Sequence, residues 1–314
     1  MVRARLVLGA LLAVLMVVAA LGMAGCGSSG ASGTGASGTG ASANGADGGA
    51  GERPVIVATT PILGAIVRDA VRDAADVRVL MPNGGDPHEW RPSAKDVAEL
   101  QSADLVVQNG LGLEQGLQEA IAQARDDGVP VFTATDHVAV RPGDPHFWTD
   151  PSQAAKVVAA LPAAVRGATG ADIAASAAKA GKRLAALDAE IANDFAKVPE
   201  TARNVVTGHE SLGYLAARYG LALTGAVTPS LSSQGQVSAA HLKQLEDAMS
   251  RAGVRVVFTE TGLPNAVADA VVAQAGATLV QLGTEALPDD GTYATYIREL
   301  TRRMSSALAN NTGG

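Results

Sequence analysis

Beyond residue 52, short apolar runs alternate with segments in which apolar residues recur every three or four positions. Short runs bounded by turn residues indicate buried strands, and the longer period indicates helices with one buried face. The pattern predicts strands at about residues 55–59, 77–81, 105–108, 129–133, 204–207, 221–227, 254–259 and 278–282. A helix is predicted after each strand, which is typical of parallel sheets, and two of these helices are expected at about residues 114–125 and 210–219. We therefore predict an α/β fold of two lobes, each a four-stranded parallel sheet flanked by helices.

The middle of the chain carries the longest helical pattern, at about residues 171–197. At 1.5 Å per residue such a helix is about 40 Å long, enough to run along one lobe and reach the other. We predict one long rigid connecting helix within residues 169–200, between an N-terminal lobe at 53–168 and a C-terminal lobe at 201–314. Its apolar stripe could alternatively form a coiled-coil dimer. The stripe consists of Ile173, Ala177, Ala180, Leu184, Leu187, Ile191, Phe195 and Val198.

The N-terminal residues have a different composition. Arg3 and Arg5 precede an apolar run at residues 6–23, which is typical of a secretory signal peptide. Cys26, the only cysteine, follows shortly and gives a pattern that resembles a bacterial lipobox; a fortuitous cysteine is the alternative. We expect a lipoprotein signal peptide at 1–25, lipidation of Cys26 and a flexible Gly/Ser/Ala tether at 26–52. The folded part would then be extracytoplasmic, anchored to the outer face of the cell membrane.

Two Asp-Pro-His steps lie between predicted strands, at residues 86–88 and 144–146, each followed two residues later by tryptophan. An Asp-Pro step favours an extended or turn backbone, so His88 and His146 are expected on stiff loops. His209 follows the first strand of the second half, and Glu285 follows its last strand. Open α/β sheets bind ligands at the carboxyl ends of their strands. We therefore expect these three imidazoles and one carboxylate to converge at that edge.

Three neutral imidazoles and one carboxylate match a four-coordinate Zn²⁺ site, whereas Mn²⁺, a harder ion, prefers more oxygen ligands. Thiolate sites for Cu(I) or iron–sulfur clusters are excluded, because Cys26 is the only cysteine. Alternatives to Glu285 as the fourth ligand are Glu260, Asp289 and Asp290. Candidates for orienting the ligands from behind are Asp86, Asp144 and Glu260. The remaining histidines, His137 and His241, are expected at the surface.

Several function classes lack support in the sequence. The formal net charge is −7, and no basic stripe is present, so we expect no nucleic-acid partner. The chain contains neither a G-x-S-x-G motif nor a P-loop. His209-Glu210 lacks a second histidine four residues on, so it is not the helix of a zinc protease.

Four motifs resemble those of the zinc/manganese-binding solute-binding lipoproteins of bacterial ABC importers. They are G-G-D-P-H-E-W-R-P-S at 84–93, N-G-L-G-L-E at 109–114, D-P-H-F-W-T-D-P at 144–151 and H-E-S-L-G-Y-L-A-A-R-Y-G-L at 209–221. The resemblance implies two α/β lobes with the metal in the cleft between them, bound by His88, His146 and His209. Histidine at the third place goes with zinc in this family, and glutamate with manganese. The fourth family ligand is usually aspartate in an S-D-x-L context, which Glu285 replaces here.

The resemblance implies a non-enzymatic function. We expect a monomeric protein that captures Zn²⁺ with high affinity and delivers it to an ABC-type membrane permease. The alternatives are a manganese-binding member of the same class, a zinc-dependent hydrolase with Glu260 as a base, and a partner-binding lipoprotein that uses metal structurally.

Overall fold

The computed structural model describes residues 52–139, 141–261 and 265–310. The expected signal peptide, Cys26 and the tether up to residue 51 lie outside the described residues and stay predictions. No helix in the described part of the chain is both long enough and apolar enough to cross a membrane.

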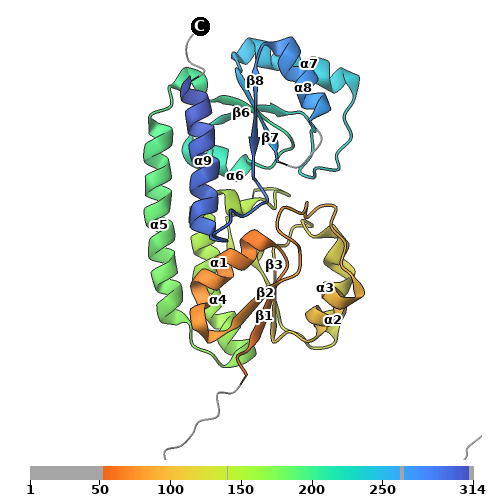
Figure 1. Ribbon diagram of the computed structural model, residues 1–314, viewed down its shortest axis with the longest axis vertical. Coiled ribbons are helices and arrows are strands. Elements are labelled where there is room, and N and C mark those ends of the chain that lie inside the picture. Colours follow the sequence, from red (N-terminus) through yellow and green to blue (C-terminus); the bar gives the residue numbers. More distant parts are fainter. Residues whose placement is uncertain (1–51, 140, 262–264, 311–314) are drawn as a thin grey trace, which may run out of the picture. The chain divides into compact units, whose positions relative to one another are not determined.

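The first half forms a parallel sheet in the order β2-β1-β3-β4, and the second half forms another in the order β6-β5-β7-β8. Figure 1 shows both sheets with helices around them, which confirms the predicted fold class. The first sheet consists of β1 (Val55–Ala58), β2 (Asp76–Val79), β3 (Leu105–Gln108) and β4 (Val131–Thr133). The second consists of β5 (Asn204–Thr207), β6 (Ala222–Ala226), β7 (Val256–Glu260) and β8 (Thr278–Leu282). The helices are α1 (Pro61–Val71), α2 (Ala94–Gln101), α3 (Gln118–Asp126), α4 (Pro151–Thr169), α5 (Ala174–Ala196), α6 (Gly213–Tyr219), α7 (Ala239–Ala252), α8 (Ala266–Ala275) and α9 (Tyr293–Asn310).

Local capping signals fix where several helices begin. The Thr60 side chain accepts from the backbone N–H of Leu63, and Pro61 occupies the first turn of α1. Ser93 and Asp96 form a reciprocal capping box at the start of α2. The Asp150 carboxylate caps α4 by accepting from the backbone N–H of Ser152. These loops therefore end at defined residues, which stiffens the segments before them.

Two helices begin later than the sequence pattern predicts. The segment after Glu114 first forms a 3-10 turn, Gln115–Leu117, and α3 begins at Gln118. The helix predicted from Glu210 begins at Gly213. The N–H of Glu210 donates to the carbonyl of Ser230 in another loop, and the N–H of Ser211 donates to the carbonyl of His209, so the chain after β5 forms a turn at this point.

Helix α5 contacts elements of both halves of the chain. All eight positions of its predicted apolar stripe are buried, and it packs against α1, α4, α6 and α9. Figure 1 shows it running alongside α9. Arg183 pairs with Asp69 of α1, and Glu190 pairs with Arg298 of α9. The stripe is covered within the chain, which leaves it unavailable for a coiled-coil dimer.

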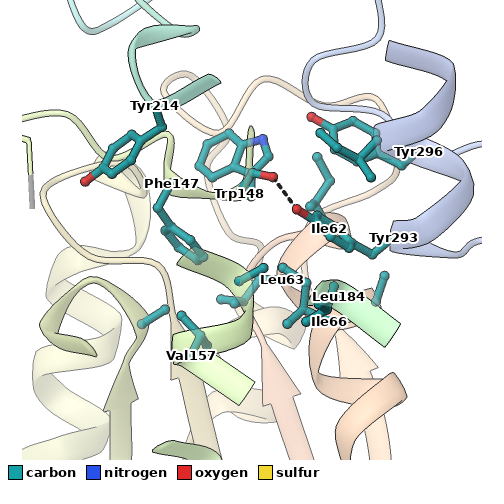
Figure 2. Close-up of a cluster of buried hydrophobic side chains, with 14 of the residues drawn as sticks. Ile62, Leu63, Ile66, Phe147, Trp148, Val157, Leu184, Tyr214, Tyr293 and Tyr296 are labelled. Atoms are coloured by element: carbon teal, nitrogen blue, oxygen red, sulfur yellow. Dashed lines mark hydrogen bonds between the residues drawn. The ribbon is translucent and has the colours of Figure 1, made fainter. Parts of the chain in front are cut away.

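One hydrophobic cluster draws side chains from both halves. Figure 2 shows Ile62, Leu63 and Ile66 of α1 close to Phe147 and Trp148, with aromatic rings arriving from the second half. The hydroxyl of Tyr293, from α9, donates to the backbone carbonyl of Trp148 at 2.7 Å. The loop after β4 is therefore fixed by a core to which the C-terminal helix contributes. Further cluster members from the second half are Tyr214, Tyr219 and Tyr296.

Candidate metal centre

The structure brings His88, His146, His209 and Glu285 together. One ligand atom from each side chain lies within 4.8 Å of those of the other three. His88 follows β2 and His146 follows β4 in the first half, while His209 follows β5 and Glu285 follows β8 in the second. The site thus lies where the carboxyl ends of the two parallel sheets meet, as expected for open α/β sheets.

The spacing of the imidazole nitrogens matches tetrahedral coordination. His146 Nε2 lies 3.4 Å from His88 Nε2 and 3.3 Å from His209 Nε2. Zinc–nitrogen bonds of 2.0–2.1 Å place neighbouring ligands of a tetrahedron about 3.3–3.4 Å apart. All three rings are buried, with exposed fractions of 6%, 0% and 1% for His88, His146 and His209. The nitrogens therefore converge on one point that a small cation could occupy.

His146 is oriented by its own loop. Asp144 Oδ1 accepts from the backbone N–H of His146 at 3.0 Å and lies 2.9 Å from His146 Nδ1. A proton held on Nδ1 by this carboxylate leaves Nε2 free as an acceptor toward the cluster. Gly213 makes room for the arrangement, since a Cβ there would clash with Asp144 Oδ2. Asp144 thus has the geometry of the expected orienting group.

The Asn109–Glu114 motif supports the loop that carries His146. The Asn109 side chain donates to the carbonyl of Pro145 at 2.9 Å, directly before His146. Buried Glu114 accepts from the Thr59 hydroxyl and the Asn109 N–H, both at 2.6 Å. Burial raises the pKa of the Glu114 carboxyl, and these hydrogen bonds oppose that rise. The motif therefore supports the backbone directly before His146.

His209 lies against Glu260, the last residue of β7. Their Nδ1 and Oε1 atoms are 3.0 Å apart, an ion-pair distance without hydrogen-bond geometry, and Ser211 donates to the same oxygen at 3.1 Å. Gly208 beside it leaves room for this contact, because a Cβ there would force the Glu260 carboxylate to shift. Glu260 therefore stands behind the His209 ring, which fits an orienting role better than that of a fourth ligand.

Asp86 does not contact the His88 ring, although it was expected to orient a ligand. Its Oδ1 accepts from the backbone N–H of His88 at 2.8 Å, and its Oδ2 accepts from the Ser233 hydroxyl at 2.5 Å. Among the described residues, His88 Nδ1 has no hydrogen-bond partner. Asp86 therefore holds the backbone of the His88 loop and ties it to the second half.

Glu285 lines an acidic cavity of about 190 Å³ together with Asp86, Glu89 and Glu260. Glu89 and Thr261, which also line it, are exposed, so the cavity brings Glu285 close to solvent. Burial raises the pKa of the Glu285 carboxyl well above its ordinary value, and the charges of Asp86 and Glu260 raise it further. Its Oε1 has no hydrogen-bond partner in the described part of the chain.

Burial lowers the pKa of two of the histidines. The pKa of His88 is lowered to about 3 by burial first and then by the neighbouring His146 and His209. Burial also lowers the pKa of His146, although Asp144 opposes the change. Since the desolvated cluster disfavours imidazolium, these two rings are neutral at physiological pH and available as ligands.

The other sequence candidates lie elsewhere. Asp289 and Asp290 are exposed, and Asp290 accepts from Thr292 and Thr295 at the start of α9. His137 is exposed and stacks on Phe132, with ring centroids 4.6 Å apart. His241 is half-buried, and its Nε2 bonds the carbonyl of Ala226 at 2.8 Å, so it is less exposed than expected.

Comparisons of sequence agree with this arrangement. A family model described as zinc-uptake complex component A, periplasmic (ZnuA), matches residues 56–307. The high-affinity zinc uptake system protein ZnuA of Paracoccus denitrificans is 29% identical over 310 residues, covering 83% of this chain and 93% of the relative. The manganese-binding lipoprotein MntA of Halalkalibacterium halodurans is 28% identical over 268 residues, covering 82% of this chain and 89% of the relative.

Solved structures show the same fold. The periplasmic zinc-binding protein TroA of Treponema pallidum has a TM-score of 0.72 at 22% identity, over 82% of this chain and 99% of that one. A manganese-bound periplasmic metal-binding protein of Candidatus Liberibacter asiaticus has a TM-score of 0.72 at 19% identity, over 82% and 100% of the two chains. Because the family model covers most of the folded part, the chain belongs to the ZnuA family, the periplasmic component A of zinc-uptake complexes, whose members are solute-binding proteins and not enzymes.

Proposed function

We propose that this protein binds Zn²⁺ as cargo through His88, His146, His209 and Glu285. The observation that carries the proposal is the separation of His146 Nε2 from the Nε2 atoms of His88 and His209, which matches the edge of a zinc–imidazole tetrahedron. Three neutral imidazoles and one carboxylate would leave the loaded site with about one net positive charge, and the carboxylates of Asp144 and Glu260 lie behind two of the rings. Family membership removes the hydrolase alternative.

Zinc is favoured over manganese by the ligand set. Imidazole nitrogen suits Zn²⁺, whereas Mn²⁺ is better served by carboxylate and water oxygens. Only Glu285 contributes an oxygen to the four-residue cluster. The names of the relatives include both a zinc-binding and a manganese-binding protein, so the metal has to be decided by the site itself.

The test is a competition between the two ions. Metal-free protein dialysed against equimolar Zn²⁺ and Mn²⁺ should retain close to one zinc ion per chain and little manganese, measured by elemental analysis. X-ray absorption of the loaded protein should show nitrogen-rich four-coordination. Retention of manganese in preference to zinc, or a site with mostly oxygen ligands, would contradict the assignment.

Metal binding should release a proton from Glu285. Its pKa is raised, so between its ordinary value near 4.5 and that raised value the metal-free carboxyl holds a proton that a cation must displace. His88 and His146 have lowered pKa values and contribute little. Affinity should therefore fall up to about tenfold per pH unit as pH falls through this window. Calorimetric titration in two buffers of different ionisation heat measures the released proton, and Glu285→Gln should abolish it.

We further propose that the loaded protein delivers its metal to an ABC permease while anchored to the membrane through Cys26. Support comes from the cysteine after the apolar segment and from the lipoprotein names of several relatives. Detergent-phase partitioning of the wild-type chain should be lost in Cys26→Ala, which checks the anchor. If Cys26→Ala still partitions into detergent, the anchor is excluded.

We also propose lobes at residues 53–168 and 201–314 with α5 as the connecting helix, and a monomeric protein.

A further inference from the structure

The segment that carries Glu285 is attached to the first half of the chain on both sides. Before it, the carbonyl of Thr284 accepts from the indole Nε1 of Trp148 at 3.1 Å. After it, the Asn83 side chain donates from Nδ2 to the Leu287 carbonyl and accepts at Oδ1 from the Leu287 N–H, both at 2.8 Å. A carboxylate supplied by the second half is therefore positioned by two side chains of the first half.

These two side chains belong to the loops that carry the first-half histidines. Asn83 lies five residues before His88, and Trp148 lies two residues after His146, with its ring centroid 5.2 Å from that imidazole. Displacement of Glu285 from the histidines consequently requires these attachments to change. They couple the fourth proposed ligand to the two loops it would have to leave during metal release.

The two attachments differ in how easily they break. Trp148 is only 5% exposed, and its acceptor, the Thr284 carbonyl, also accepts from the hydroxyl of Tyr296 at 2.7 Å inside the core. Asn83 is exposed, so water can replace both of its hydrogen bonds without opening the core. Asn83 is therefore the attachment that can yield while the remainder of the fold stays intact.

We propose that Asn83 is a positioning residue that holds the Glu285 segment against the His88 loop and thereby sets the rate of metal release. The inference rests on the proposed metal-binding function. Asn83 does not touch the cluster; it acts through the backbone of Leu287. Loss of its two hydrogen bonds frees the segment to move, which shortens the time for which Glu285 stays on the ion.

The test compares wild type, Asn83→Ala and Asn83→Asp in the full chain loaded with Zn²⁺. Aspartate favours the same turn conformation as asparagine but lacks the donor, and it sets a carboxylate against the Leu287 carbonyl. Stopped-flow transfer of zinc to an excess of a chromophoric chelator gives the dissociation rate. Both variants should release zinc about tenfold faster than wild type, while the metal-free melting temperature changes by no more than about 2 °C. Asn193→Ala, at an exposed asparagine of α5, is the matched control and should match wild type.

The zinc-release rates of the two variants decide whether Asn83 has the proposed role. A wild-type rate in Asn83→Ala overturns the proposal. A wild-type rate in Asn83→Asp alone assigns the effect to the turn and also overturns it. Failure of the wild-type chain to bind zinc would instead sink the proposed function, which keeps the two failures distinguishable.

Discussion

Replacing His146 with alanine should abolish tight zinc binding. His146 is fully buried, and its Nε2 is the nitrogen that lies within 3.4 Å of both other imidazoles. Structural zinc sites bind with about 10–16 kcal/mol shared among four ligands, so the loss of one costs about 3 kcal/mol, or a hundredfold or more in affinity. Competitive titration against a chelator of known affinity measures the change.

His137→Ala is the matched control, because His137 is exposed and stacks on Phe132. It should bind zinc as the wild-type chain does. Melting of metal-free His146→Ala, followed by circular dichroism, separates loss of a ligand from loss of the fold. Wild-type affinity in a folded His146→Ala protein would show that the metal binds elsewhere.

Zinc should raise the melting temperature of the wild-type protein by about 10 °C. A ligand at a thousand times its dissociation constant adds about 4 kcal/mol to the free energy of unfolding. For a domain of this size, each kcal/mol shifts the melting temperature by about 2–4 °C. Differential scanning fluorimetry with zinc and with chelator measures the shift, and Glu285→Gln should reduce it.

The metal-free form should nevertheless unfold cooperatively. Each half has its own apolar cluster away from the histidines, around Val57 and Leu100 in the first and around Val206 and Val257 in the second. These cores require no ion. A chelated protein without any unfolding transition would instead indicate that the metal is structural.

The sequence predicted the fold well because its strands are short apolar runs with turn residues on both sides. The ends of β3, β5 and β8 agree with the apolar runs at 105–108, 204–207 and 278–282 to the residue. The predicted start of α6 is three residues too early, and the hydrogen bond from the Glu210 N–H to the Ser230 carbonyl in this segment is one that no local pattern reveals. Local signals report capping and periodicity, whereas contacts between distant loops leave no such mark.

In the candidate site, too, the sequence did not reveal contacts between distant loops. His88, His146 and His209 could be selected because each follows a strand, and parallel strands end at one edge. The roles of Asn83 and Ser233 could not be found, since each is a polar residue in a turn-rich loop whose partner lies more than a hundred positions away. Asp86 was selected for its place beside His88, but only the structure shows that it bonds backbone and Ser233 and not the ring.

The shared aromatic cluster has a consequence for the order in which the protein can fold. Tyr293 and Tyr296 of the last helix pack with Ile62 near the beginning of the folded part, and Tyr293 bonds the loop that holds His146. The earlier half therefore cannot complete its interior until the final segment has been synthesised. A nascent chain lacking that segment would leave Ile62 and the loop of Trp148 without these aromatic partners.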